Sequence, residues 1–241
     1  MQRIGCFTRL SALYTALVLV ALVISACAGQ PAVVKEVPAD ALQGTQGLLV
    51  GSFARQPIAP TYNGYTFSFR GGPDNKARKL YMAPDLKSPL GRFKNDFSTP
   101  ESDGSIFSFL LPAGDYELIG FDFFLNGGSP ILHRNWRQDE LFSIPFTVKP
   151  GVANYLGEIK AIPKVRKGFL GDEVRDGGLW KISDQRPRDI PVLAERYPNV
   201  DWSTVNTVVP HTANKSNPLV YLPDEPLPAS VVQYILSKRK R

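Results

Sequence analysis

The stretch "GSIFSFLLPAGDYELIGFDFFLNGG", residues 104–128, decides the fold class. Phe107, Phe109 and Leu111 alternate with other residues, and alternate side chains of a β-strand lie on one face. The segment Pro112-Ala113-Gly114-Asp115 predicts a turn, because proline and aspartate favour turns and glycine tolerates a positive φ. The chain is then expected to return as a second strand over residues 116–124, so this part of the protein is β-structure.

The same pattern continues on both sides of this stretch. Between residues 47 and 162 we expect about seven short strands, over residues 47–53, 62–72, 78–84, 104–111, 116–124, 141–148 and 155–162. Residues 85–103 are rich in Pro, Asp and Ser and predict a long loop. Pro145 lies inside a predicted strand, and proline within a sheet favours an edge strand or a bulge.

Two of the turns resemble those of a known fold family. "LLPAGDYEL" (110–118) resembles the hairpin that joins two core strands in transthyretin-like and carboxypeptidase-regulatory-like domains. "FTVKPGVANYLGEI" (146–159) resembles the matching hairpin in bacterial lipoproteins of unassigned function with such a domain. The resemblance implies a mainly β fold, in which residues 47–162 form an antiparallel transthyretin-like β-sandwich.

Residues 163–241 predict a mixed, partly helical C-terminal extension. Residues 177–184 read as a strand and 188–198 as a short helix, with Asp189 as its N-cap. Residues 228–241 read as a final helix that ends in basic residues, which suit a helix C-terminus. Trp180 and Trp202 are expected to pack between this extension and the sheet.

The N-terminus has the layout of a secretory signal peptide. Arg3 and Arg9 precede an almost wholly apolar run over residues 10–24, which is shorter than the roughly 20 residues of a membrane span. The run ends in Ile24-Ser25-Ala26-Cys27, which resembles a bacterial lipobox. The resemblance implies cleavage before Cys27, an S-diacylglycerol group on its sulfur and an N-palmitoyl group on its amine.

This interpretation divides the chain into a lipoprotein signal peptide (1–26), a flexible tether (27–46), the β-sandwich (47–162) and the extension (163–241). Ala28, rather than Asp, follows the cysteine, which by the same resemblance favours the outer membrane. Two alternatives remain open: an ordinary signal peptide cut at an A-x-A-like site, and an uncleaved anchor helix. Apart from Cys27 the chain holds only Cys6, so the processed protein can form no internal disulfide.

The charge is concentrated at the C-terminus. The formal net charge is +6, and removing Arg3 and Arg9 with the signal peptide leaves 6 − 2 = +4. Lys238–Arg241 alone supplies +4, so the chain lacks the broad basic surface of a nucleic-acid-binding domain. This cluster either contacts anionic lipid or is a solvated tail.

The residue types that catalysis requires are scarce. The only histidines are His133 and His211, whereas a zinc site takes three or four ligands. The G-x-S-x-G, P-loop and Rossmann motifs are all absent. Asp122 lies among aromatic residues and is the one carboxylate that invites a catalytic interpretation, although alternation places it on the polar face of its strand. We therefore predict no enzyme, no cofactor and no metal.

A binding role has a candidate site in "HRNWRQDE". There Trp136 is flanked by Arg134, Asn135 and Arg137, a set that can stack on a sugar ring or anchor a protein interface. The alternative is a tryptophan folded back over the end of the sandwich. The sequence thus predicts a periplasmic lipoprotein that is held to the bilayer by acylated Cys27 and binds or scaffolds an envelope protein. A glycan- or peptidoglycan-binding module is the alternative, a hydrolase a more distant one, and nucleic acid is excluded as a partner.

Overall fold

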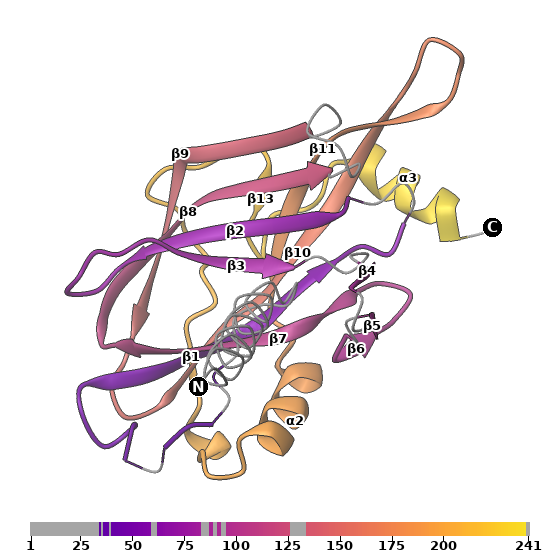
Figure 1. The fold of residues 1–241 in the computed structure, drawn as a ribbon. Coiled ribbons are helices and arrows are strands. Elements are labelled where there is room, and N and C mark those ends of the chain that lie inside the picture. Colours follow the sequence, from indigo (N-terminus) through magenta and orange to yellow (C-terminus); the bar gives the residue numbers. More distant parts are fainter. Residues whose placement is uncertain are drawn as a thin grey trace, which may run out of the picture.

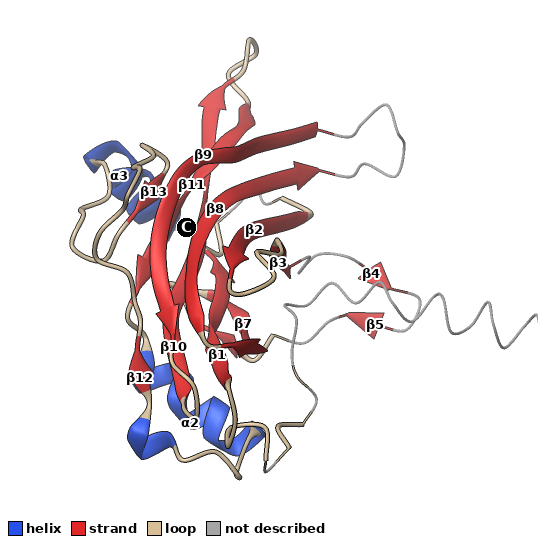
Figure 2. Ribbon diagram, turned by 90° about the vertical axis from the view of Figure 1, so that its left-hand side faces the viewer, coloured by secondary structure: helices blue, strands red, loops and turns tan. Residues whose placement is uncertain are grey.

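The computed structural model of the protein describes residues 34, 36–38, 40–58, 62–82, 87–88, 91–92, 95–125 and 134–239, without the side chains of 87–92, 134–141 and 239. Two sheets face each other, and two helices flank the larger one (Figures 1 and 2). Within the described ranges, no helix is long and apolar enough to cross a membrane.

The larger sheet, sheet A, has seven strands. Its order is β13 (Val220–Tyr221), β11 (Glu173–Ser183), β10 (Ala153–Lys167), β1 (Gln46–Arg55), β7 (Asp103–Pro112) and β6 (Phe97–Ser98), and β12 (Asn206–Thr207) also pairs with β10. The four-stranded sheet B has the order β3 (Arg78–Met82), β2 (Gly64–Gly71), β8 (Gly114–Leu125) and β9 (Arg134–Val148). The short strands β4 (Lys87–Ser88) and β5 (Gly91–Arg92) pair with each other. The remaining elements are α2 (Arg186–Arg196), a 3₁₀ turn over Trp202–Thr204 and α3 (Ala229–Arg239).

The prediction of an antiparallel transthyretin-like sandwich is wrong, because sheet A is mixed. β1 runs parallel to β10, with Leu48 opposite Ala153 and Arg55 opposite Ala161. β12 and β13 add two more parallel pairs, on β10 and β11. Hydrophobic alternation shows which face of a strand is buried, but it does not encode the direction of the neighbouring strand. The sequence pattern therefore could not reveal the mixed sheet.

The two turns that suggested hairpins instead connect the two sheets. β7 lies in sheet A and β8 in sheet B, and the chain returns from β9 in sheet B to β10 in sheet A. Both turns are fastened to the start of β1, because Ala113 N donates to Thr45 O (2.8 Å) and Gly151 N donates to Gln46 O (2.9 Å). A turn motif shows that the chain reverses, but not whether the two strands it joins pair with each other.

Of the alternating residues predicted to share a face, Phe107 and Leu111 are buried and Phe109 is half-buried. Alternate residues of β2 and β9 also face the core. Tyr65, Phe67 and Phe69 of β2 are fully buried, and Phe142, Ile144, Phe146 and Val148 of β9 are also buried. Pro145 lies in β9, an edge strand of sheet B, as expected of a proline within a strand. Both faces of β1 are covered, and nine of its ten residues are buried.

Trp180 of β11 fills the centre of the space between the sheets. Its ring stacks on Phe53 of β1, with centroids 5.3 Å apart, and meets Phe67 of sheet B edge-on at 5.0 Å and Phe123 at 5.1 Å. Its Nε1 has no hydrogen-bond partner among the residues described. We expected Trp180 to pack at the junction between the extension and the sheet, but it is a central residue of the core. Residues beyond 162 therefore complete the core that residues 47–162 begin.

The chain also joins the core before β1. Val34 N donates to Ser108 Oγ (2.8 Å), and Tyr197 OH donates to Val34 O (2.6 Å). Val37 is buried in the main hydrophobic cluster. The chain is therefore already bonded to the folded body at residue 34, within the segment 27–46.

We predict that Trp180→Ala lowers the free energy of unfolding by about 3–5 kcal/mol, the cost of truncating a large aromatic side chain in a packed core. Trp202 is only half-buried, so Trp202→Ala is the matched control and should cost distinctly less. Urea titration followed by circular dichroism measures both. Equal losses in the two variants would contradict the central position of Trp180.

Candidate functional site

The predicted binding residues lie in a strand rather than in a loop. Residues 134–137 open β9, where Trp136 is paired with Phe123 and Arg137 with Asp122 of β8. The side chains of Arg134, Asn135, Trp136 and Arg137 lie outside what the structure describes, so their role in binding stays a prediction. His133 and Cys27 also lie outside the described residues.

The other candidate groups do not converge. Asp122 is half-buried on β8 between Thr66 and Arg137, while its neighbours Phe121 and Phe123 are buried in the core. His211 Nδ1 lies 2.7 Å from Asp224 Oδ2 on the exposed surface. Over the part of the chain whose side chains are described, no three His, Cys, Asp or Glu residues form a group that could hold a metal ion.

The most concentrated polar chemistry lies between sheet A and α2. Ser52 of β1 and Glu158 of β10 are paired in register, and α2 brings Arg188 and Asp189 onto them. The Arg188 guanidinium donates to Glu158 Oε1, Asp189 Oδ1 and Ser52 Oγ, each at 2.7 Å. Both carboxylates are 0% exposed. We call Ser52, Tyr155, Glu158, Arg188 and Asp189 the α2 network.

Further donors complete both carboxylates of the α2 network. Asp189 Oδ2 accepts from Tyr155 OH and from Ser52 Oγ, both at 2.7 Å. Glu158 Oε1 also accepts from Ser102 Oγ at 2.6 Å, and Lys160 Nζ lies 3.5 Å from Glu158 Oε2. The ring of Phe97 covers the Arg188 guanidinium at 3.6 Å.

For each of the two carboxylates, burial raises the pKa and the neighbouring cations lower it, but the net result differs. Burial raises the pKa of Asp189, and Arg188 only partly offsets it. Burial would also raise the pKa of Glu158, but Lys160 and Arg188 outweigh it and hold the pKa below its ordinary value. Burial and the nearby Asp189 raise the pKa of Tyr155, so its hydroxyl remains a protonated donor.

The geometry of the α2 network suits fastening rather than catalysis. A general acid or base must come within hydrogen-bonding distance of its substrate, whereas these carboxylates are closed off from solvent and bonded to internal donors. Ser52 Oγ donates to Asp189 Oδ2 and accepts from the Arg188 guanidinium, so its hydroxyl is engaged within the network. The network therefore clamps α2 onto sheet A.

Sequence reasoning missed this network and assigned Asp189 a wrong role. We predicted Asp189 as the helix N-cap, but the N-cap is Gln185 and Asp189 lies buried in the first turn. The members come from three segments that are far apart in the chain, and no local motif connects them. The only sequence signal is an adjacent Arg-Asp pair at the start of a helix, which is usually a solvent-exposed feature.

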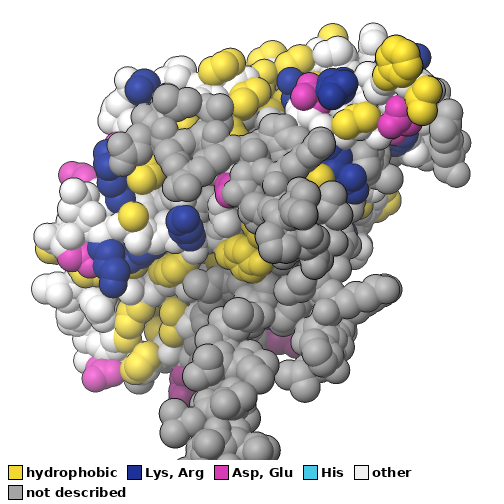
Figure 3. Space-filling model, turned by 45° about the horizontal axis from the view of Figure 1, so that its top comes forward, with side chains coloured by type: hydrophobic (Ala, Val, Ile, Leu, Met, Phe, Trp, Pro, Cys, Tyr) yellow, Lys and Arg dark blue, Asp and Glu magenta, His cyan; other side chains and the backbone are white. Residues whose placement is uncertain are grey.

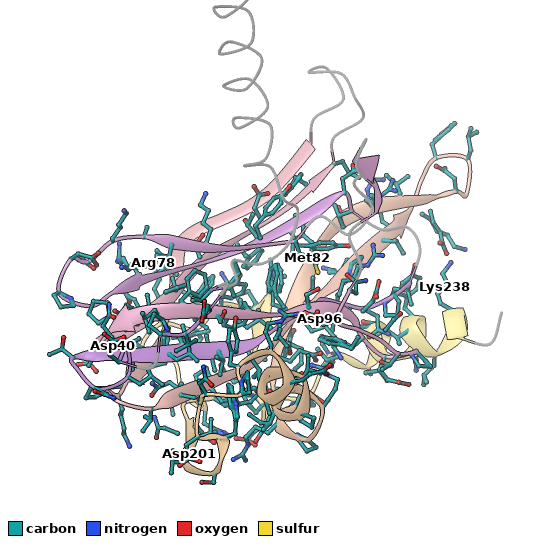
Figure 4. The ribbon with its side chains drawn as sticks, turned by 60° about the horizontal axis from the view of Figure 1, so that its bottom comes forward. Asp40, Arg78, Met82, Asp96, Asp201 and Lys238 are labelled. Carbon is teal, nitrogen blue, oxygen red and sulfur yellow. The ribbon has the colours of Figure 1, made fainter. Side chains whose placement is uncertain are left out.

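A polar hollow of about 570 Å³ lies beside α2, lined by Asn95, Asp96, Val192, Glu195 and Arg196. Arg196 donates to Asp96 Oδ1 at 2.6 Å, and the other Asp96 oxygen accepts from Ile106 N at 2.9 Å. Asp96 lies next to α2 in Figure 4. Among the lining residues that the structure describes, Arg196 is the only cation, and it is already paired with the Asp96 carboxylate.

Comparison with known proteins gives no family for this chain. No protein-family model matches the sequence, and no curated protein matches it either. A leucine-rich repeat protein from Bacteroides thetaiotaomicron is among the solved structures it resembles, with 10% identity and a TM-score of 0.27. The alignment covers 81% of this chain and 29% of that protein.

We predict that Arg188→Ala lowers the free energy of unfolding by about 3–5 kcal/mol, because it leaves two buried carboxylates without their shared cation. Arg186→Ala, at the first residue of the same helix, is the matched control. It breaks an ion pair with Asp184 in which both side chains are exposed, and it should cost no more than about 1 kcal/mol. Chemical denaturation of both variants measures the difference. Similar losses would mean that the α2 network does not fasten the helix.

The lowered pKa of Glu158 predicts a pH-dependent contribution to stability. A carboxylate whose pKa is lower in the folded than in the unfolded protein stabilises the fold above its ordinary pKa, and this contribution is lost as pH falls through the folded value. Wild type should therefore be more stable than Glu158→Gln at neutral pH, and the gap should narrow on acidification. Asp189, whose pKa is raised, acts with the opposite sign but is present in both proteins. A gap in unfolding free energy that does not change with pH would contradict this assignment.

Proposed function

We propose that the protein is an envelope lipoprotein, held by acylated Cys27 to the periplasmic face of the outer membrane, with a non-catalytic binding or scaffolding role. The observation that carries the proposal is the short spacing between the lipobox-like segment and Val34, which is bonded to the folded body. Cys27 ends the lipobox-like segment, and Val34 is already bonded to Ser108 and Tyr197. Only residues 28–33 separate the two.

This spacing limits the distance between the lipid anchor at Cys27 and the folded body. At full extension, a chain covers at most about 3.3–3.6 Å per residue, so Val34 lies within about 25 Å of Cys27. Two or three acyl chains make membrane attachment stable, whereas one chain binds reversibly. A short connection to a stable anchor holds the folded body close to the bilayer, which suits a scaffold or a binding module.

The non-catalytic part of the proposal is supported by the α2 network. It is the densest set of ionisable groups in the described structure, and its carboxylates are closed to solvent. The surface then carries the binding capacity, with residues 134–137 as one predicted site for an envelope protein. A glycan-binding role for the same residues remains the alternative.

The anchor can be tested by metabolic labelling with a palmitate analogue. The wild-type protein should incorporate the label and stay with membranes through a high-salt wash, whereas Cys27→Ala should do neither. Cys6→Ala is the matched control, because it removes the other cysteine within the segment expected to be discarded, and it should label normally. Label on Cys27→Ala, its retention in salt-washed membranes, or labelling that is lost in Cys6→Ala would refute the lipobox assignment.

A further inference from the structure

The large apolar side chains that are exposed in the described structure gather at one end of the molecule. Phe169 is 103% exposed and Leu170 88%, at the tip of the hairpin formed by β10 and β11. Val232 and Leu236 of α3 are 40% and 50% exposed. Figure 1 shows the hairpin projecting from the body with α3 beside its base. We call residues 164–176 together with α3 the finger end.

The hairpin tip holds its two apolar side chains away from the body. Gly171 N donates to Gly168 O (3.1 Å), and Gly168 N donates to Asp172 O (2.7 Å), which closes a tight turn around Phe169 and Leu170. Gly171 has a φ of +80°, which glycine adopts without strain. Turn positions of this kind usually carry polar residues, so a Phe-Leu pair there requires an explanation.

The second apolar element is attached to the same end. Ile235 anchors α3 in a small cluster with Ile58, Ile162 and Leu179. Lys238 Nζ donates to Glu173 Oε2 at 2.6 Å, which ties the end of the helix to the start of β11. Val232 and Leu236 lie one helical turn apart and therefore share a face of α3. The two apolar projections thus belong to one coupled unit.

The finger end carries most of the net positive charge of the chain. Residues 164–176 hold four basic residues and three acidic ones, namely Lys164, Arg166, Lys167 and Arg175 against Asp172, Glu173 and Asp176. Helix α3 adds Lys238 and Arg239, so the formal balance of the finger end is 6 − 3 = +3. The chain after residue 26 has a formal charge of +4, which leaves only 4 − 3 = +1 for all its other residues. Arg166 and Lys167, next to the tip, are exposed.

We infer that the finger end docks on an anionic bilayer surface, with Phe169 and Leu170 entering the boundary between headgroups and acyl chains. Apolar side chains inserted about 5–10 Å deep, with lysine and arginine at headgroup level, are how peripheral proteins bind bilayers. In Figure 3, apolar, basic and acidic side chains lie close together on the projecting part of the molecule. The tip is also narrow, whereas a stable protein interface buries roughly 800 Å² on each partner. A bilayer needs no matching pocket for such a tip.

This inference does not depend on lipidation of Cys27, but it has a consequence for orientation if both contacts exist. Tyr155 of β10 is bonded to Asp189 of α2. Twelve residues of β10 separate Tyr155 from Lys167, so at about 3.3 Å per residue the hairpin tip lies about 40 Å from Tyr155. Asp40 and Lys238 lie at opposite ends of the molecule in Figure 4. Because the chain from Cys27 to Val34 reaches at most about 25 Å, the anchor and the finger end can contact one bilayer only when the hairpin is inclined toward the membrane surface rather than perpendicular to it.

Vesicle binding by the unlipidated chain tests the inference. Residues 28–241 contain every residue of the described core, so this chain is expected to fold without the anchor. It should sediment with phosphatidylcholine vesicles that contain about 30% phosphatidylglycerol, bind pure phosphatidylcholine far more weakly and be released by salt. Phe169→Ser with Leu170→Ser should weaken partitioning at least about tenfold through loss of apolar insertion.

Two double variants that remove the same charge at different places test whether binding depends on the basic residues of the finger end or only on the net charge of the protein. Arg166→Ser with Lys167→Ser should weaken binding at least about tenfold. Lys76→Ser with Lys79→Ser removes the same charge from the turn between β2 and β3 and from the start of β3. It should change binding less than about twofold because these residues lie outside the docking surface. All of these side chains are exposed, so thermal unfolding should be unchanged. No binding to anionic vesicles, or equal losses in the two charge variants, would overturn the inference, as would tip variants that bind vesicles normally but lose crosslinking to an envelope protein.

Discussion

The position of β1 is the constraint on which the other elements depend. It is paired along both edges, antiparallel to β7 and parallel to β10, and it is buried on both faces. Neighbouring residues of one strand point to opposite faces, so Phe53 enters the aromatic core toward sheet B while Ser52 enters the α2 network. Both inter-sheet turns are also bonded to its first residues. A shift of β1 by one residue would exchange these two environments.

The sequence was informative about which face of a strand is buried, but not about which strands pair with each other. Alternation is a local signal, and alternate residues of β2 and β9 are buried, whereas β7 is buried on both faces around Phe107. Pro145 is another local signal: it predicted an edge strand or a bulge, and β9 is an edge strand. The pairing of β1 with β10 joins residues about one hundred positions apart, and no local pattern records it. The same limit explains why the turns at 112–115 and 149–151 suggested hairpins. Trp180 illustrates this limit. It lies at the centre of the core, although the sequence pattern placed it in a C-terminal extension outside the predicted sandwich.

The candidate site was hidden for a different reason. A buried ion cluster requires charges that local propensity places at the surface, and desolvation makes such clusters expensive unless every group is bonded. Arg188 meets that condition by serving two carboxylates and a hydroxyl at once. Because misplacing α2 by even one turn would leave buried charges unpaired, the network fixes where the helix sits more strictly than apolar contacts alone. The network thus selects one position of α2 on sheet A, which an amphipathic pattern alone could not do.

The distribution of charge and apolar surface gives the molecule two distinct ends. At the α2 end, charges are paired inward and the chain from residue 34 is bonded to the body. At the finger end, apolar side chains face solvent and basic residues outnumber acidic ones. Exposed apolar groups are costly to solubility, and a long hairpin adds backbone order without adding core, so neither feature is explained by stability. Features that stability does not explain are best explained by contact with something outside the chain, and the rigid turn at Gly168–Gly171 fixes the direction in which that contact is made.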